Sequence, residues 1–268
     1  MRMNFIEYGN KNKEVILLLH GGGFSWWNYR EAAGILASGY RVILPFLDGH
    51  AGSYADFTTI KENAARIISF IDDNFGGSVL LIGGLSLGGQ ILLEILSQRT
   101  DICRYALIES ALAIPSEFTY SMIRPAFGSC YGLIRRRWFA KLQFRSYRLK
   151  QELFEDYFRD SSCISKTDMM AFLEANALYS LKTSLRETSA EVHIFVGGKE
   201  NRAMRKSAEI IHKALPGSEL QILPRMVHGA FSMNHAVDYA DTVLRIVRTR
   251  DNRKFIKSQK ENNYETRL

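Results

Sequence analysis

Apolar residues occur along this chain in two patterns: short continuous runs, and longer stretches with helical spacing. The continuous runs are typical of strands that are buried on both faces of a parallel sheet. In the stretches between them, apolar residues recur at i, i+4, i+7 and i+8, so that one face of a helix is apolar. Because the two patterns alternate, we predict an α/β fold with a mostly parallel sheet and helices on both faces. The predicted strands are residues 14–19, 41–45, 79–82, 104–108, 191–196 and 219–223, and helices are predicted over residues 60–75, 203–215 and 237–247.

The alternation stops over residues 115–187, where no strand-like run occurs. This segment is rich in aromatic residues and arginine and has the pattern of several short helices. Because a structureless insertion of this length is uncommon in a compact domain, we predict a helical cap over the ends of the strands. The predicted core is then residues 1–114 and 188–248. Residues 249–268 are polar and charged, and we expect them to form a flexible basic tail.

A Gly-x-Ser-x-Gly motif, Gly84 to Gly88, joins the third predicted strand to a helical stretch. A strand–turn–helix of this kind holds its serine, here Ser86, on a tight turn with the hydroxyl pointing out of the fold. Glycine suits both flanking positions because the turn needs unusual backbone angles and because strand and helix pack closely. The first turn of the helix also directs free N–H groups toward whatever the serine attacks. We therefore predict that Ser86 is a catalytic nucleophile.

A serine hydroxyl is a weak nucleophile without a neighbouring base, which is usually a histidine held by a carboxylate. His228 follows the last predicted strand, in a loop at the carboxyl edge of the sheet where the sites of α/β proteins assemble. His235, at the start of the last helix, is the alternative base. Structural roles are expected for the others, which lie before a glycine-rich loop, in a loop after a strand, within a strand and on a helix: His20, His50, His193 and His212.

The carboxylate that holds the histidine is expected after a strand, between the serine and the histidine in the chain. Glu200 lies just past the fifth predicted strand, after two glycines that permit a tight exit. A carboxylate at this point can accept the second imidazole N–H of His228. Glu109 also ends a strand and is the rival acid, and Asp48 is a weaker alternative. The predicted triad is therefore Ser86, Glu200 and His228.

The oxyanion that forms when a carbonyl is attacked needs preorganised hydrogen-bond donors. The backbone N–H of Leu87, directly after the serine, is one candidate. The second is expected in the glycine-rich loop after the first predicted strand, where Gly22 is the first choice and Gly23 the next. This loop matches neither of the glycine patterns that bind nucleotide phosphates. No cluster of His, Cys and carboxylate residues has metal-ligand spacing, so we expect neither a metal nor a cofactor.

Composition and charge narrow the class of protein. The chain has 268 residues, of which 46% are hydrophobic, enough for one large core with a lid. The net charge of +7 is concentrated in residues 115–186 and 248–268, which carry +5 and +4. We interpret both regions as solvated surfaces, because no nucleic-acid-binding motif accompanies them.

The cysteines, the first residues and the longest apolar runs together indicate the compartment in which the protein resides. Three widely spaced cysteines predict neither a disulfide framework nor a zinc site. The first residues lack the basic stretch, apolar run and cleavage site of a secretory signal. No apolar run approaches the ~20 residues that a membrane span needs. We therefore expect a cytoplasmic protein without a membrane span.

Five motifs of this chain form a recognisable set: His20-Gly21-Gly22-Gly23, Asp48-Gly49-His50-Ala51-Gly52-Ser53, Gly84-Leu85-Ser86-Leu87-Gly88, Gly198-Lys199-Glu200 and His228-Gly229. Together they resemble those of the α/β-hydrolase superfamily, over residues 4–112 and 190–248. The order nucleophile, acid, histidine is also that of the family. The chain departs from the usual pattern in having glutamate rather than aspartate as the acid, and Ala51 in place of a glycine.

The resemblance implies a serine hydrolase that cleaves a small ester, thioester or related acyl compound through an acyl-enzyme on Ser86. A serine at this turn, in place of an aspartate, argues against haloalkane dehalogenase or epoxide hydrolase chemistry. The alternatives are a ligand-binding or regulatory protein on a hydrolase scaffold and, among enzymes, a C–C hydrolase or an acyltransferase. Four aromatic residues are candidates for lining an apolar acyl pocket: Phe24, Trp26, Trp27 and Trp138.

Overall fold

The computed structural model describes residues 3–248 and is built around a seven-stranded sheet, in the order β1-β3-β2-β4-β5-β6-β7. The strand β1 (Phe5–Tyr8) runs antiparallel to its neighbour, and all other pairs are parallel. All six strands predicted from the sequence are confirmed. They are β2 (Val15–Leu19), β3 (Arg41–Pro45), β4 (Val79–Leu85), β5 (Cys103–Glu109), β6 (Glu191–Gly197) and β7 (Glu219–Leu223).

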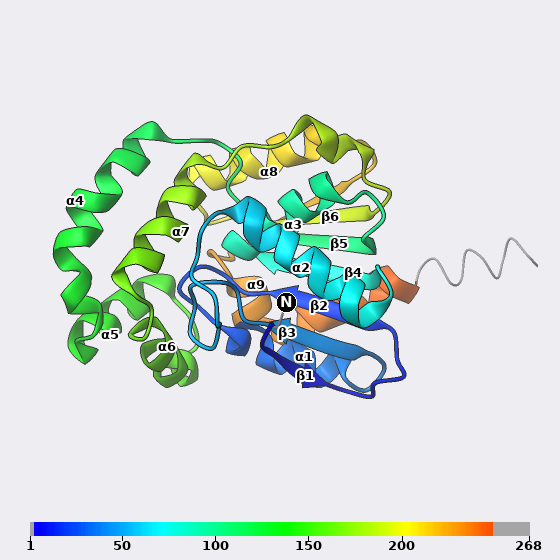
Figure 1. The fold of residues 1–268 in the computed structure, drawn as a ribbon, viewed down its shortest axis with the longest axis horizontal. Coiled ribbons are helices and arrows are strands. Elements are labelled where there is room, and N and C mark those ends of the chain that lie inside the picture. The colour runs from blue at the N-terminus through cyan, green and yellow to red at the C-terminus, as the bar shows by residue number, and fades with distance from the viewer. Residues whose placement is uncertain (1–2, 249–268) are drawn as a thin grey trace, which may run out of the picture.

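Helices cover both faces of this sheet, as predicted (Figure 1). Alternate residues of the strands belong to two separate hydrophobic clusters; in β2, for example, Leu17 packs on one side and Leu18 on the other. This alternation follows from the two-residue period of a strand. The helices of one face are α2 (Ile60–Phe75), α3 (Leu87–Gln98) and α8 (Arg202–Ala214), and those of the other are α1 (Arg30–Leu36) and residues 236–248.

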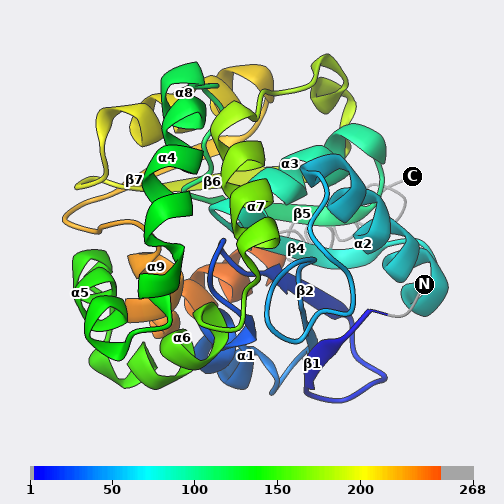
Figure 2. The ribbon, with the colours of Figure 1, turned by 60° about the vertical axis from the view of Figure 1, so that its left-hand side comes forward.

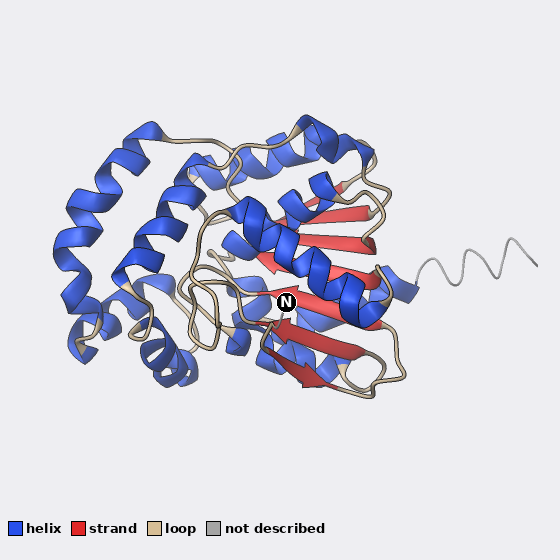
Figure 3. Cartoon of the chain, viewed as in Figure 1, coloured by secondary structure: helices blue, strands red, loops and turns tan. Residues whose placement is uncertain are grey.

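The insertion, residues 115–187, is helical throughout its regular structure, as predicted. Its helices lie beyond the arrowheads of the parallel strands, at the carboxyl edge of the sheet (Figure 3). Figure 2 shows the same helices in front of the strand ends. They are α4 (Glu117–Ile134), α5 (Arg137–Tyr147), α6 (Phe154–Ser161) and α7 (Lys166–Leu178), with short 3-10 turns at Gln151–Leu153 and Thr183–Glu187.

Buried hydrogen bonds attach the insertion to the core at two points. The backbone N–H of Phe57 donates to Asp168 Oδ1 at 2.8 Å, and Trp27 Nε1–H donates to Asp160 Oδ2 at 2.9 Å. Because a buried carboxylate without partners is costly, these contacts favour one placement of α6 and α7 on the core. The insertion therefore holds a defined position over the sheet edge.

Two further sequence predictions concern the chain as a whole. Within residues 3–248, no helix is long and apolar enough to span a membrane. The predicted tail, residues 249–268, lies outside the described residues.

Candidate active site

Ser86 occupies the single residue between β4 and α3, at the carboxyl edge of the sheet. Its backbone has φ 54° and ψ −113°, a conformation that costs a non-glycine residue on the order of 1–3 kcal/mol. The Ser86 N–H donates to the carbonyl oxygen of Glu109 at 2.8 Å, which ties the turn to the neighbouring strand. Strain of this kind persists only where the surroundings over-determine it, and it places the serine side chain at the tip of the turn.

The two glycines of the motif are required by backbone contacts. A Cβ on Gly84 would lie 2.4 Å from the carbonyl oxygen of Gly88, within the turn itself. A Cβ on Gly88 would lie 2.2 Å from the carbonyl oxygen of Leu19, at the end of β2. Both distances are far below van der Waals contact with atoms that cannot move aside. The helix α3 can therefore approach the sheet closely enough to form the turn only if both positions are glycine.

His228 and Glu200 are brought together at the same edge. His228 lies in the loop between β7 and α9 (Ala230–Asn234), and its Nδ1–H donates to Glu200 Oε2 at 2.8 Å. The proton on Nδ1 leaves Nε2 as the acceptor, which is the tautomer that a general base needs. A Cβ added to Gly229, the residue after His228, would lie 3.3 Å from Leu85 Cδ2. The His228 loop thus packs directly against the residue that precedes Ser86.

The carboxylate of Glu200 is held by several donors at once. Oε1 accepts hydrogen bonds from Ser110 Oγ at 2.6 Å and from the Gly197 N–H at 2.7 Å, while Oε2 accepts from His228. Burial by itself raises the pKa of Glu200, but the hydrogen bonds from His228, Ser110 and Gly197 outweigh it, and the pKa lies below its usual value. Glu200 is therefore ionised near neutral pH, oriented, and paired with the imidazole.

The other two candidate acids do not bond to His228 in this structure. The carboxyl group of Glu109 is buried, and its Oε1 accepts from the Ser232 N–H at 3.3 Å. Burial raises the pKa of Glu109 to about 7. Asp48 forms an ion pair with Arg66 Nε at 3.1 Å, and burial raises its pKa to about 6. The geometry therefore favours Glu200 as the acid.

The glycine-rich loop after β2 lies beside the turn of Ser86. A Cβ on Gly22 would lie 3.5 Å from Leu87 Cβ, so the two predicted oxyanion donors belong to neighbouring residues. The N–H of Gly23 donates to His50 Nε2 at 3.0 Å. Because that N–H already has an acceptor, the structure corrects the assignment of Gly23 and favours Gly22 as the partner of Leu87.

His50 holds the glycine-rich loop through a hydrogen bond, which is a more specific role than the structural one expected for it. Its Nδ1–H donates to the Asp48 carbonyl oxygen at 2.9 Å, so that Nε2 is free to accept from Gly23. Burial lowers the pKa of His50 to about 4, which keeps the ring neutral. His20, beside it with ring centroids 5.0 Å apart, accepts the Leu47 N–H on Nε2 at 3.2 Å. His20 thus has a structural role, as expected, and both imidazoles join the loops after β2 and β3.

A cavity of about 200 Å³ lies between this loop and the insertion. Its walls are mostly apolar, and Gly22 at its base connects it to the candidate oxyanion site. The ring of Phe172 stacks on His50 with centroids 4.9 Å apart, so the cavity wall and the loop support each other. The lining residues are Gly22, Gly23, Phe127, Ile134, Gln143, Tyr147, Tyr157, Ser161, Met169, Phe172 and Leu173.

None of the four aromatic residues predicted for the pocket lines this cavity, which corrects that prediction. Trp27 is 1% exposed and donates its N–H to an acid of α6, and Phe24 is buried against Trp27 and two tyrosines. Trp26 lies under the guanidinium of Arg30 at 4.6 Å. Trp138 is 64% exposed on α5. The aromatic residues that line the cavity are instead Phe127, Tyr147, Tyr157 and Phe172.

A second hollow, a groove of about 300 Å³, is lined in part by Glu200 and His228 themselves. It lies between the end of α5 and the start of α8, and its walls are mainly polar. The lining residues are Ser146, Arg148, Lys199, Glu200, Asn201, Met204, Val227 and His228. Over residues 3–248, no group of three or more His, Cys, Asp or Glu side chains is arranged to hold a metal ion.

Comparison with known proteins gives one family. The model of the family described as "Alpha/beta hydrolase family" matches residues 16–242. A thermostable monoacylglycerol lipase from Bacillus sp. (strain H-257) is 30% identical over 117 residues, which are 41% of this chain and 45% of the lipase. The match thus spans less than half the length of that relative.

Two solved structures illustrate the likeness in fold. A thermophilic esterase from Thermogutta terrifontis superposes with a TM-score of 0.76 at 18% identity, covering 92% of this chain and 93% of the esterase. The enol-lactonase from Burkholderia xenovorans LB400 superposes with a TM-score of 0.74 at 14% identity, covering 90% of this chain and 95% of that protein. At these identities, the likeness concerns the fold alone.

Proposed function

The chain belongs to the alpha/beta hydrolase family, and we propose that it is a serine hydrolase that cleaves small carboxylic esters or related acyl compounds. One observation carries the proposal: the ionised Glu200 accepts a hydrogen bond from His228 at 2.8 Å, and the loop that contains His228 packs against the strained turn of Ser86. An esterase, a lipase and an enol-lactonase among the similar proteins support ester bonds as the substrate class.

In the acylation step, Ser86 Oγ attacks the carbonyl carbon of the ester while His228 Nε2 takes the hydroxyl proton. Glu200 stabilises the imidazolium that forms and holds it in place. The N–H groups of Leu87 and Gly22 donate to the oxyanion of the tetrahedral intermediate. When the intermediate collapses, the C–O bond to the alcohol breaks, and His228 gives its proton to the leaving oxygen.

Deacylation repeats the same steps with water. His228 Nε2 takes a proton from the water as its oxygen attacks the acyl-enzyme carbonyl, and the proton then returns to Ser86 Oγ. The apolar cavity above Gly22 accommodates the acyl chain through both steps. In this proposal the helices of residues 115–187 act as a cap, because four of them surround or contact that cavity.

The test is hydrolysis of p-nitrophenyl esters from acetate to laurate by the wild-type protein and by Ser86→Ala. Activity is expected in the wild type and not in the variant, and the chain-length optimum reports the depth of the cavity. Ser38→Ala, in an exposed turn after α1, is the matched control and keeps wild-type activity. Circular dichroism checks that every variant is folded.

Two results would contradict the proposal. Ser86→Ala that hydrolyses the esters as fast as the wild type shows that Ser86 is not the nucleophile. Folded wild-type protein without activity on any ester, and without labelling of Ser86 by a fluorophosphonate, favours a ligand-binding protein on this scaffold.

A further inference from the structure

The two hollows of the candidate site differ in chemistry, and the reaction assigns a different part of the substrate to each. The leaving oxygen must lie within hydrogen-bond reach of His228 when it takes its proton. The polar groove is a space that His228 lines, so it is available to the rest of the leaving group. The carbonyl oxygen points to Gly22, and the acyl chain continues into the apolar cavity that Gly22 lines.

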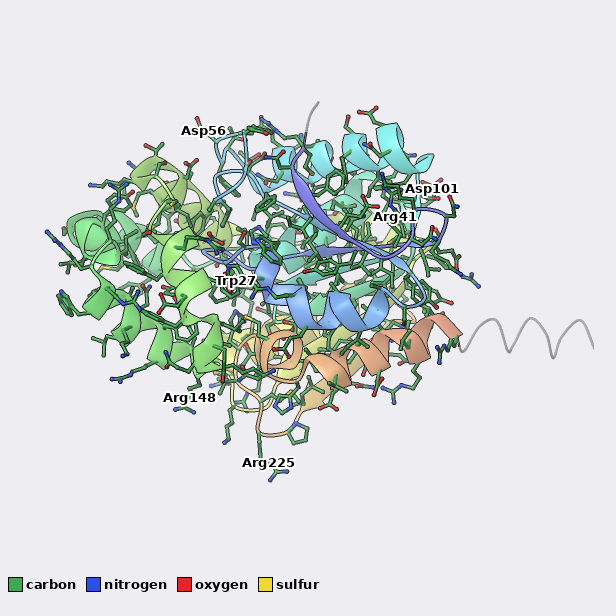
Figure 4. The ribbon with its side chains drawn as sticks, turned by 90° about the horizontal axis from the view of Figure 1, so that it is seen from below. Trp27, Arg41, Asp56, Asp101, Arg148 and Arg225 are labelled. Carbon is green, nitrogen blue, oxygen red and sulfur yellow. The ribbon has the colours of Figure 1, made fainter. Side chains whose placement is uncertain are left out.

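The groove carries positive charge from two separate parts of the chain. Arg148 comes from the insertion, where it ends α5 in a left-handed conformation with φ 56°. Lys199 comes from the core, in the turn between β6 and α8. Both side chains are exposed, and neither forms an ion pair with a carboxylate in the part of the chain that the structure describes. Figure 4 shows Arg148 projecting outward on the same side of the molecule as Arg225, whose side chain is also exposed.

The groove offers these two cations no free carboxylate oxygen. Its one acidic lining residue is Glu200, whose oxygens already accept from His228, Ser110 and Gly197. The helix α8 begins at the groove with Asn201 as its N-cap. The N-terminus of a 13-residue helix adds partial positive charge and further backbone N–H groups. Two exposed cations beside a helix N-terminus form a setting that favours a phosphate group.

We propose that this groove is a leaving-group subsite for an anion, and that the preferred substrates are esters of an apolar acyl chain with a phosphorylated alcohol. The inference rests on the proposed function. The bond that breaks is the carboxylic ester C–O bond: Ser86 Oγ bonds to the acyl carbon, and the alcohol oxygen takes the proton from His228. The released alcohol keeps its phosphate intact, because no phosphorus bond takes part.

A matched pair of substrates tests the inference directly. Decanoyl-lysophosphatidic acid and monodecanoylglycerol carry the same acyl chain and glycerol, and they differ only in the phosphate. The readout is the ratio of their kcat/KM values, phosphorylated over neutral. The wild-type ratio is expected to exceed about ten, and to fall as salt is added, since exposed charges are screened.

Variants then assign the preference to the two cations. Arg148→Ala and Lys199→Ala are each expected to lower the ratio by roughly threefold to fivefold, the upper part of the range for an exposed charge contact. The double variant lowers it to about one, and Lys199→Arg retains the preference because it keeps the charge. Lys206→Ala is the control: Lys206 is exposed on α8 and does not line the groove, so this variant keeps the wild-type ratio.

The failure of this inference differs from the failure of the proposed function. A wild type that hydrolyses monodecanoylglycerol with a ratio of one or less overturns the anion subsite and leaves the serine hydrolase standing. A ratio above ten that is unchanged in the double variant also overturns it, because the preference then arises elsewhere. Folded protein that cleaves p-nitrophenyl esters but neither of these two substrates also overturns the subsite alone, whereas folded protein without activity on any ester and without fluorophosphonate labelling of Ser86 overturns the proposed function and the subsite with it.

Discussion

Replacing Glu200 by glutamine is expected to abolish most of the activity through the tautomer of His228. Glu200 Oε1 accepts from two donors, Ser110 Oγ and the Gly197 N–H, whereas Oε2 faces a single donor, His228 Nδ1. The amide oxygen of the glutamine takes the place of Oε1, because an NH₂ group there would oppose two donors. The NH₂ group then faces His228 and donates to Nδ1, which moves the imidazole proton to Nε2.

A His228 that carries its proton on Nε2 cannot accept the proton of Ser86. An equivalent carboxylate-to-amide change in a serine protease triad lowers kcat by about 10⁴, which corresponds to about 5.5 kcal/mol in the activation barrier. We expect a loss of this order in kcat for Glu200→Gln, with KM for p-nitrophenyl esters changed little. The shape of the side chain is conserved, so the variant is expected to fold.

The rival acid provides the control. Glu109→Gln alters a carboxyl group that faces Ser232 rather than His228, so its kcat is expected to stay within about tenfold of the wild type. Steady-state kinetics of both variants, together with their thermal unfolding, separate a catalytic loss from a loss of fold. If Glu109→Gln is the slower enzyme, or if Glu200→Gln keeps a tenth of the activity, the assignment of Glu200 as the acid is refuted.

Three more predictions follow from the turn and from the buried carboxyl. Ser86→Gly is expected to be about 1 kcal/mol more stable than Ser86→Ala in urea unfolding, because glycine relieves the positive φ of this residue; equal stability would refute the strain. Gly88→Ala is expected to lower the free energy of unfolding by more than about 3 kcal/mol or to prevent folding, because its Cβ meets a carbonyl at 2.2 Å, while Gly34→Ala in α1, with open space around it, is neutral or stabilising. Glu109 keeps its proton up to about pH 7 in the folded chain and loses it near its usual pKa of 4.5 in the unfolded chain, so the free energy of unfolding decreases between these pH values by up to about 3 kcal/mol. Glu109→Gln removes this decrease, and urea unfolding at about pH 5 and about pH 8 measures it; the same slope in both proteins would refute the buried proton.

The sheet was predictable because its central strands are buried on both faces and are therefore continuous apolar runs. The strand β1 escaped prediction, since Phe5–Tyr8 is short, half-buried and paired antiparallel at the edge. The helix α1 escaped it too, because Arg30–Leu36 is too short for its apolar residues to repeat. Patterns of burial therefore predict the elements at the centre of the sheet better than those at its margin.

The choice between Glu200 and Glu109 needed the structure. Both acids follow adjacent parallel strands at the same edge, so chain order alone brings either one close to the histidine. The two side chains point in different directions. Glu109, the last residue of β5, directs its buried carboxyl group to the Ser232 N–H, whereas Glu200 follows a tight turn that directs its carboxylate to His228. The direction of a side chain after a strand end depends on the backbone of the turn, which the sequence pattern does not specify.

The walls of the apolar cavity could not be predicted, for a different reason. Its aromatic walls come from several helices of the insertion, and which face of each helix points inward depends on how the helices pack together. Trp138 and Tyr147 both lie on α5, yet the first is exposed and the second lines the cavity. The role of His50 had a weak signal, since it follows the strand next to the one that precedes Gly23.

The hydrogen bonds that His20 and His50 accept make the glycine-rich loop after β2 sensitive to acid. Each ring accepts a backbone N–H on Nε2, and a ring that binds a proton there can no longer accept. Because the pKa values are about 3 and about 4, and the rings are 5.0 Å apart, protonation of one opposes protonation of the other. Acid therefore removes the two hydrogen bonds one after the other, that of the Gly23 N–H at about pH 4 and that of the Leu47 N–H at about pH 3, and the decline of activity is expected to extend over both steps. A rate profile in that range would report the loss of the hydrogen bonds that hold the glycine-rich loop in place.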